Sequence, residues 1–371
     1  MYKKLLIFIP HINVGGVEKN FFLITNYLAK KLNNNVSVIT VNKEFTKKLN
    51  KKIKIISPKS NKWEKSTMYT KYTISLFLLI KTLISDRNYL IFSFQANWYA
   101  IIITKLLGLK IVTRSNTAPE GWSKGVIKNF FYKLVINFSD EIIVNSKEFK
   151  ESLKKYFNVN SVCIYNPLDK SKILKLSKNK DRFNFFAKRK YLKIINIGRF
   201  TDQKNQLLIL KAIKYLNNRI PIKLLIIGRG RNFKNLKNFI NKNKLERNVI
   251  LKKFVSNPYP FLKLSDVFIL SSNYEGLPNV LLEAQFLKKI IISTKCPTGP
   301  KEILLNGKAG IFFKMDDYKD LSRKIIHVYK NKKKLKNMIK IGYNNLHRFD
   351  ENKNLNIYYQ IITKYLKNEK N

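Results

Sequence analysis

Short apolar runs alternate with amphipathic stretches along most of the chain. The runs that predict β-strands lie at residues 4–10, 35–41, 89–94, 110–113 and 141–146, and again at 193–198, 223–228, 249–254, 267–272 and 289–294. Between them, apolar residues recur at helical spacing. Strands that alternate with helices are typical of a parallel sheet covered by helices on both faces. We therefore predict an α/β fold of two doubly wound, Rossmann-like domains that face a cleft.

The alternation stops once, in a polar and basic stretch at residues 166–190, and resumes after it. This break predicts two domains with the following limits: a first domain at 1–170, a linker at 171–190, a second domain at 191–345 and a C-terminal helix at 346–371. In the last segment, helical spacing relates Leu355, Tyr358, Ile361 and Ile362. We expect this helix to pack back on one of the domains, and a crossing to the first domain is one such arrangement.

Composition supports a folded protein with two cores. The 371 residues are 45% hydrophobic and 13% aromatic, which argues against a disordered chain and suits two domains of about 150 residues each. Cys163 and Cys296 have no metal-binding or CxxC spacing, so we interpret them as buried thiols of a cytoplasmic protein. The stretch 72–84 carries Lys81 and is shorter than the ~20 residues that span a bilayer. We expect a cytoplasmic protein, either soluble or peripheral on the inner face of the membrane.

The net charge of +50 favours an anionic partner, such as nucleic acid, an anionic membrane or a charged glycan. Lys residues number 62 and Arg residues 11, and the excess is spread along the chain. Arg side chains, whose planar guanidinium groups recognise nucleic-acid bases by paired hydrogen bonds, are therefore few, and no nucleic-acid-binding motif is present. We expect no nucleic acid partner. The charge itself is either compositional bias or a surface for an anionic membrane.

Glycines and cations follow several of the predicted strands. Ligands of open α/β sheets bind at the carboxyl ends of strands, where the next helix begins. Gly15 and Gly16 come after the first strand, and Arg199 and Lys204 flank the loop after strand 193–198. Two cations at such a helix start indicate a bound anion the size of a diphosphate. The alternative is that the glycines only make tight turns and the cations are ordinary surface charges.

The stretch EGLPNVLLEA at 275–284 follows the predicted strand 267–272. Glu275 then lies in the strand–helix loop, and Glu283 lies one to two turns into the helix, with Pro278 suited to its first turn. Two carboxylates with backbone N–H groups between them suit a ligand that has hydroxyls at both ends and an anion in the middle. A nucleotide sugar has that shape. The alternative is that both carboxylates are solvated helix ends.

An ordered set of motifs spans essentially the whole chain. The set is GGVE at 15–18, NPLD at 166–169, GRF…QKN at 198–205, GRG at 228–230 and E-x7-E at 275–283. It resembles the retaining glycosyltransferases of family 4, which have the GT-B fold of two Rossmann domains. The stretch at 295–313 resembles the branch that uses UDP-sugars to build bacterial surface or lipid-linked glycans.

The resemblance implies roles for the matching residues. Glu275 holds the hydroxyls of the donor sugar, Glu283 holds the ribose hydroxyls, and Arg199 with Lys204 neutralises the diphosphate. The remaining donor-binding residues implied by the match are Gly15, Gly16, Gly198, Gly228, Gly276, Leu277, Pro278 and Asn279. The resemblance also implies retention at the anomeric carbon without a metal, and the adjacent Asp316 and Asp317 do not stand at a strand end.

One segment departs from the family pattern. Many members have a His after a first-domain strand that contacts the donor sugar, whereas this chain has TRSNTAPEGW there. By analogy with branches that use an Arg/Asn pair, we assign Arg114 and Asn116 to the donor site. The identity of the donor sugar stays open as a consequence.

These observations predict a retaining, metal-independent enzyme that moves a hexose or N-acetylhexosamine from a nucleotide sugar to a glycan or lipid-linked acceptor. The donor is expected to be a UDP-sugar, which acts as a co-substrate, and no further cofactor is expected. The acceptor is expected on the first domain, where stretches 97–110 and 121–136 either rest on a membrane or face the core. The alternatives are a related nucleotide-sugar epimerase or hydrolase and a basic nucleic-acid-binding protein.

Overall fold

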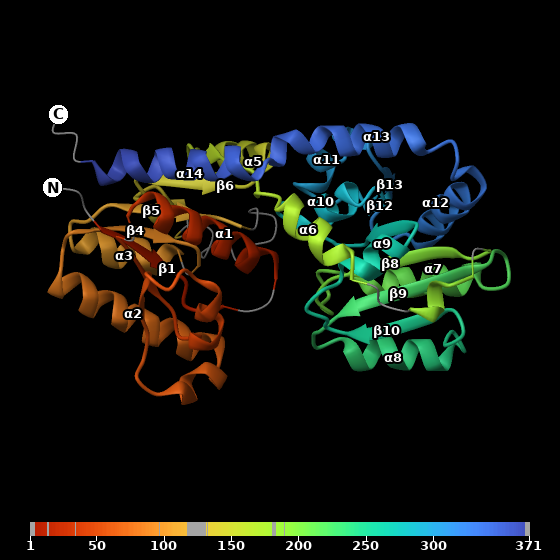
Figure 1. Cartoon of the computed structure of the whole chain (residues 1–371), viewed down its shortest axis with the longest axis horizontal. Coiled ribbons are helices and arrows are strands. Elements are labelled where there is room, and N and C mark those ends of the chain that lie inside the picture. Colours follow the sequence, from red (N-terminus) through yellow and green to blue (C-terminus); the bar gives the residue numbers. More distant parts are fainter. Residues whose placement is uncertain are drawn as a thin grey trace. The chain divides into compact units, whose positions relative to one another are not determined.

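The chain folds into two compact units in the computed structural model (Figure 1). The structure describes residues 4–12, 15–33, 35–95, 97–116, 131, 133–179, 183–188 and 190–367. Unit 1 contains Met1–Pro167 and Glu351–Asn371, and unit 2 contains Leu168–Asp350. The chain thus passes between the units after Pro167 and again after Asp350, and residues 171–190, expected to be a linker, belong to unit 2.

In the described part of unit 1, parallel strands form a seven-stranded sheet in the order β3-β2-β1-β4-β5-β6-β7. The strands are β1 (Lys4–Phe8), β2 (Val36–Ile39), β3 (Lys54–Ile56), β4 (Tyr89–Ser93), β5 (Ile111–Arg114), β6 (Glu141–Val144) and β7 (Val162–Cys163). The chain winds outward from β1 through β2 and β3, then returns to the other side of β1 for β4. The switch point of this doubly wound sheet therefore lies between β1 and β4.

Helices cover both faces of this sheet. They are α1 (Gly16–Lys31), α2 (Met68–Ser85), α3 (Asn97–Leu106), α5 (Lys147–Phe157) and α14 (Glu351–Leu366), with the 3-10 helices η1 (Lys43–Lys48) and η2 (Asn61–Lys65). Leu5 and Ile7 of β1 pack in the cluster that includes α1 and α14, whereas Leu6 and Phe8 pack against α2 and α3. This alternation follows from the two-residue period of a strand. The predicted C-terminal helix that packs back is confirmed as α14, which lies on unit 1 (Figure 1). None of the described helices is both long and apolar enough to cross a membrane.

The described strands of unit 2 form a six-stranded parallel sheet in the order β10-β9-β8-β11-β12-β13. The strands are β8 (Leu192–Ile197), β9 (Ile222–Gly228), β10 (Val249–Lys253), β11 (Val267–Leu270), β12 (Ile290–Thr294) and β13 (Ile311–Phe313). The switch point here lies between β8 and β11. The loops that leave these two strands therefore meet at the same edge of the sheet.

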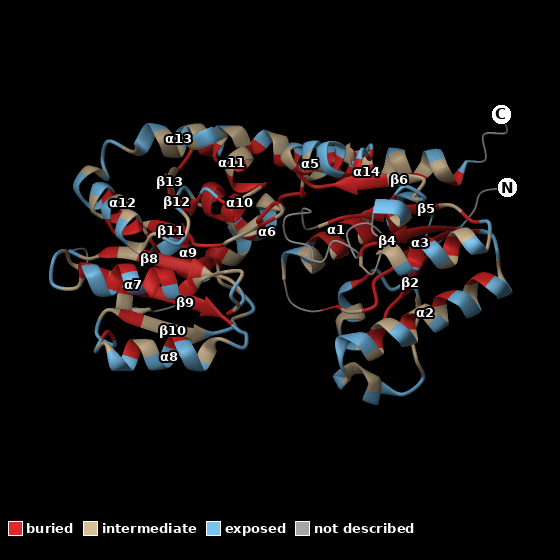
Figure 2. Ribbon diagram, turned by 180° about the vertical axis from the view of Figure 1, so that it is seen from behind, coloured by how far each residue is buried: buried red, intermediate tan, exposed pale blue. Residues whose placement is uncertain are grey.

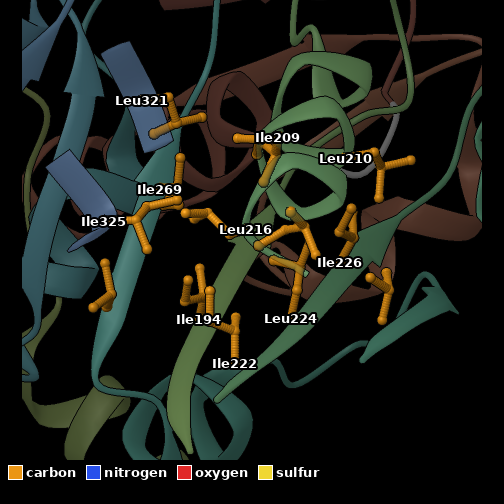
Figure 3. Close-up of a cluster of buried hydrophobic side chains, with 14 of the residues drawn as sticks. Ile194, Ile209, Leu210, Leu216, Ile222, Leu224, Ile226, Ile269, Leu321 and Ile325 are labelled. Atoms are coloured by element: carbon orange, nitrogen blue, oxygen red, sulfur yellow. The ribbon is translucent and has the colours of Figure 1, made fainter. Parts of the chain in front are cut away.

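The helices of unit 2 pack against its sheet and form the hydrophobic core with it. They are α6 (Lys170–Ser177), α7 (Gln206–Leu216), α8 (Phe233–Lys242), α9 (Tyr259–Leu264), α10 (Asn279–Phe286), α11 (Pro300–Ile303), α12 (Tyr318–Asn331) and α13 (Lys336–Asn344), with the 3-10 helices η4 (Asn184–Phe186), η5 (Leu305–Gly307) and η6 (Asn345–Phe349). Figure 3 shows Ile194 and Ile269 of the strands facing Ile209 of α7 and Ile325 of α12. The buried strands run through the centre of each unit, with exposed residues on the outer surfaces of the helices (Figure 2). A rigid sheet of this kind fixes the positions of the loops that leave it.

Candidate functional site

Glu275 and Lys204 meet at the switch point of unit 2. Lys204 lies in the loop after β8 and Glu275 in the loop after β11, and these strands are neighbours in the sheet. Lys204 Nζ donates to Glu275 Oε1 at 2.5 Å. The Lys204 side chain is 17% exposed and that of Glu275 is 7% exposed. The structure therefore brings the predicted cation and carboxylate together as a largely buried ion pair.

Hydroxyl groups fix the Glu275 carboxylate further. Ser272 Oγ donates to the same atom, Oε1, at 2.6 Å, and Thr298 Oγ1 donates to the main-chain oxygen of Glu275. Among the described residues no group donates to Oε2 of Glu275. One carboxylate oxygen is thus held by the protein, while the other is left to accept hydrogen bonds from a ligand.

The loop that follows Glu275 is packed tightly against a glycine. Gly299 has a φ of +30°, and a Cβ placed there would lie 1.8 Å from the main-chain oxygen of Gly276. Any larger residue at 299 would therefore displace the stretch from Gly276 to Asn279. Close by, Cys296 is fully buried, and this burial, followed by the negative charge of Glu275, raises the pKa of its thiol to about 12. The thiol remains protonated at neutral pH and is no nucleophile.

Arg199 lies in the same loop as Lys204, but it is exposed, whereas Lys204 is largely buried. Its guanidinium is exposed, and Nη2 donates to Gln203 Oε1 at 3.3 Å. Gln203 Nε2 in turn donates to the main-chain oxygen of Tyr274 at 3.0 Å, which ties this loop to the one that carries Glu275. The exposed Arg199 is free to turn toward an anion at this edge of the sheet.

Glu283 lies in α10 and is 4% exposed. Tyr259 Oη donates to its Oε1 at 3.3 Å. Glu275 as a residue is 6% exposed, so both carboxylates of the E-x7-E stretch are buried. The alternative that they are solvated helix ends is therefore wrong. Pro278 is the N-cap residue of α10, and Asn279 begins the helix.

Gly198 and Gly228 lie where the backbones at the carboxyl ends of β8 and β9 come into close contact. Ile197 of β8 pairs with Ile227 of β9. Gly198 directly follows β8 and Gly228 is the last residue of β9, so the two glycines lie next to each other. A Cβ at Gly228 would lie 1.9 Å from the main-chain oxygen of Gly198. This close contact accounts for the glycine at 228 without any ligand. At Gly198 a Cβ would meet only the side chains of Lys204 and Gln206, beyond 3.5 Å.

Arg114 is held inside unit 1. Its side chain is 0% exposed, and its assignment to the donor site stays a prediction. Nε donates to Tyr358 Oη at 2.8 Å, and Nη2 donates to Asn166 Oδ1 at 2.8 Å. Arg114 therefore joins β5 to α14 inside unit 1. Asn116 is half-buried, and its Nδ2 donates to the main-chain oxygen of Phe94 at 3.2 Å, a contact that supports the turn after β4.

The other predicted positions lie at helix starts. Gly15 is the N-cap residue of α1 with extended backbone, and Gly16 is the first residue of that helix. Asp317 caps α12 by accepting from the Asp320 N–H at 2.8 Å, and Asp316 accepts from Asn205 Nδ2 at 2.8 Å. Both aspartates thus have structural partners.

Sequence reasoning missed the hydroxyl residues of the site. Ser272, Thr298 and Tyr259 contact the two carboxylates or their backbone, yet they come from separate loops and a helix. Single hydroxyl residues give no periodic signal. The one available signal was the position of Ser272 directly after an apolar run that ends at the ligand-binding edge of the sheet.

Comparisons with known proteins cover both halves of the chain. Residues 14–172 match the family model described as Glycosyltransferase Family 4, and residues 177–345 match the one described as Glycosyl transferases group 1. An uncharacterised glycosyltransferase of Methanocaldococcus jannaschii is 35% identical over 206 residues, which is 51% of this chain and 48% of that protein. The chain thus matches about half of that relative's length.

Two further proteins are similar over longer stretches. The N-acetylgalactosamine-N,N'-diacetylbacillosaminyl-diphospho-undecaprenol 4-alpha-N-acetylgalactosaminyltransferase of Campylobacter jejuni is 28% identical over 262 residues, 64% of this chain and 68% of that protein. The structure of Anabaena HepE in complex with UDP-glucose superposes with a TM-score of 0.78 over 98% of this chain and 100% of that one, at 16% identity. At this identity the structural likeness concerns the fold alone.

Proposed function

We propose that this chain, whose residues 14–172 and 177–345 match family 4 and group 1 glycosyltransferase models, transfers a hexose or N-acetylhexosamine from a UDP-sugar to a glycan or lipid-linked acceptor. The setting that we propose is the assembly of bacterial surface polysaccharide, lipopolysaccharide or glycoprotein glycans. Support for a lipid-linked acceptor comes from the diphospho-undecaprenol substrate in the name of the Campylobacter relative.

The observation that carries this proposal is the buried Lys204–Glu275 pair at the switch point of unit 2. Cleavage of a sugar–diphosphate bond builds negative charge on the leaving group and positive charge on the sugar. Lys204 and Arg199 are the cations of this loop that stabilise the diphosphate, and the unpaired Oε2 of Glu275 accepts from a sugar hydroxyl. Glu283 takes the ribose hydroxyls.

We propose that transfer retains the configuration at the anomeric carbon. The bond from that carbon to the diphosphate oxygen breaks, and the bond to the acceptor oxygen forms on the same face. The proton of the acceptor hydroxyl passes to the departing diphosphate. In this scheme Glu275 orients the sugar, and the cations of the chain balance the charge without a metal.

Calorimetry of the full chain with UDP, GDP, ADP and their sugar conjugates tests the donor assignment. We expect binding of UDP-sugars, weakened about tenfold or more by Arg199→Ala and by Glu283→Ala, because each removes a charge-assisted contact. Arg323→Ala, an exposed Arg on α12, is the matched control and should leave affinity unchanged.

Other outcomes would identify the alternatives. Turnover of the UDP-sugar with no acceptor present would indicate the epimerase or hydrolase. Absence of nucleotide binding, together with tight and salt-sensitive binding of DNA or RNA, would contradict the proposal in favour of a nucleic-acid-binding protein.

We also propose that the protein works as a peripheral protein on an anionic membrane. Helices α2 and α3 contain no Asp or Glu. They expose large apolar side chains, among them Phe77 at 66%, Ile84 at 64% and Leu106 at 81%. The charged residues within these two helices are lysines, and apolar side chains combined with lysines are typical of surfaces that enter the lipid headgroup region.

Of the two stretches suggested for such a role, 97–110 forms α3, which has both buried and exposed apolar residues. Most of 121–136 lies outside the described residues. The membrane-facing surface that we propose is therefore that of α2 and α3.

Co-sedimentation with vesicles tests the membrane proposal. We expect binding to phosphatidylcholine vesicles that contain phosphatidylglycerol and much weaker binding to pure phosphatidylcholine. Phe77→Ser with Ile84→Ser should reduce the bound fraction about tenfold or more, since two large apolar contacts are lost. Tyr329→Ser on α12, an exposed aromatic residue of unit 2, is the control. Equal loss in the control, or no loss in the pair, would contradict the assignment.

A further inference from the structure

Lys71 is a buried cation without a carboxylate. It lies in the first turn of α2 and is 4% exposed. In the part of the chain that the structure describes, no carboxylate lies within ion-pair distance of its Nζ, which lies 3.4 Å from His11 Nδ1. Burial of the side chain lowers the pKa of Lys71, although the more distant Glu64 acts in the opposite direction.

His11 Nδ1 is shared between two polar neighbours, Lys71 and Asn42. His11 Nδ1 lies 3.0 Å from Asn42 Oδ1, and the same oxygen accepts from the Ile12 N–H at 3.1 Å. Asn42 Oδ1 is therefore an acceptor in this orientation, and the tautomer of His11 decides whether Nδ1 donates to it or accepts from Lys71 Nζ. Apart from this shared nitrogen, the Nζ–H groups of Lys71 have no protein acceptor among the described residues.

The position of this cluster is that of a ligand site. His11 follows β1, Asn42 follows β2, and the His11 N–H donates to Oε1 of Gln95, which follows β4, at 3.3 Å. The three loops meet at the switch point of unit 1, between β1 and β4. This is the place where open α/β sheets bind ligands. A buried ammonium with so few acceptors among the described residues is unfavourable in the free protein and becomes favourable when an anion supplies more of them.

We propose that Lys71, next to His11, binds a phosphate or diphosphate group of the acceptor at the switch point of unit 1. The inference rests on the proposed function and on the expectation from the sequence that the first domain receives the acceptor. A Lys ammonium is a compact point charge and a common partner of phosphate. Further along α2, the exposed Phe77 and Ile84 give a lipid attached to that phosphate an apolar surface on the same helix.

Titration of the full chain with inorganic diphosphate and with farnesyl diphosphate, both in the presence of saturating UDP, tests this site. We expect Lys71→Met to weaken binding about tenfold or more, because a charge-assisted contact is lost. Lys81→Met, an exposed Lys on the same helix, makes the same change in charge and should leave binding unchanged. Tighter binding of farnesyl diphosphate would identify a lipid-linked phosphate, and equal binding a free one.

A thermal unfolding measurement separates a ligand site from a structural role. Lys71→Met removes a buried charge that has no carboxylate partner among the described residues, so we expect the variant to be folded, with Tm raised by about 2–4 °C. Unchanged diphosphate affinity in a folded Lys71→Met variant would overturn the proposal. If UDP itself does not bind, the donor proposal fails. The diphosphate affinity of Lys71→Met, compared with that of Arg199→Ala, then still measures binding at the site of unit 1.

Discussion

Replacing Lys204 with Met should lower kcat/KM for sugar transfer by about two to three orders of magnitude, as is typical when one preorganised charge at a transition state is lost. The physical reason is the position of Lys204 in a largely buried ion pair, where a cation acts on a diphosphate with little screening by water. Steady-state assays with the UDP-sugar found by calorimetry measure the effect. Lys211→Met, an exposed Lys on α7, is the matched control.

The same substitution should also reduce stability, because it leaves the Glu275 carboxylate buried without a cation. Loss of one partner of a buried pair costs about 3 kcal/mol or more of unfolding free energy. In the double variant Lys204→Met with Glu275→Gln, much of that stability should return, whereas activity should not. Recovery of activity along with stability would show that the pair only supports the fold.

Replacing Tyr358 with Ala should destabilise unit 1 by about 3–5 kcal/mol, the usual range for a large buried aromatic residue. Tyr358 is fully buried in α14, and its oxygen accepts from Arg114 Nε. The substitution opens a cavity between α14 and the sheet and removes a partner from a buried guanidinium. Tyr358→Phe keeps the ring and should cost about 1–3 kcal/mol for the unsatisfied donor alone.

Urea unfolding and hydrogen exchange of α14 measure this effect. Tyr359→Phe, a change at the neighbouring and only half-buried position, should stay within about 0.5 kcal/mol of the parent protein. Unchanged exchange rates along α14 in Tyr358→Ala would mean that the Arg114 contact does not hold the helix on unit 1.

The apolar runs were sufficient to predict the main strands of both sheets, because each of those strands is buried on both faces and reads as a continuous hydrophobic segment. The pattern missed β3, β7 and β13, which have only two or three residues each. Strands this short are only partly buried and give no periodic signal. Their places at or near the sheet edges depend on tertiary packing.

Arg114 shows why the site was harder to predict than the fold. Motif order placed it after a strand at the ligand-binding edge, and an Arg there is ordinarily exposed. Its side chain instead follows the strand alternation to the face that α14 covers, where Tyr358 and Asn166 are its partners. These partners lie 244 and 52 residues away along the chain, and one sequence contains no sign of such a contact. By contrast, Lys204 and Glu275 each follow a strand that the apolar runs predicted, and the structure makes those strands neighbours.

The double passage of the chain between the units has a consequence for biosynthesis. Every residue of unit 2 precedes α14, so unit 2 has its whole sequence available while unit 1 still lacks a helix of its own core. During translation the sheet face formed by Phe92, Val112 and Ile143 stays open until residues 351–366 have left the ribosome. Unit 1 is therefore the first domain to be synthesised but the last to complete its core. Until α14 has been made, the apolar sheet face that α14 will cover is exposed to aggregation.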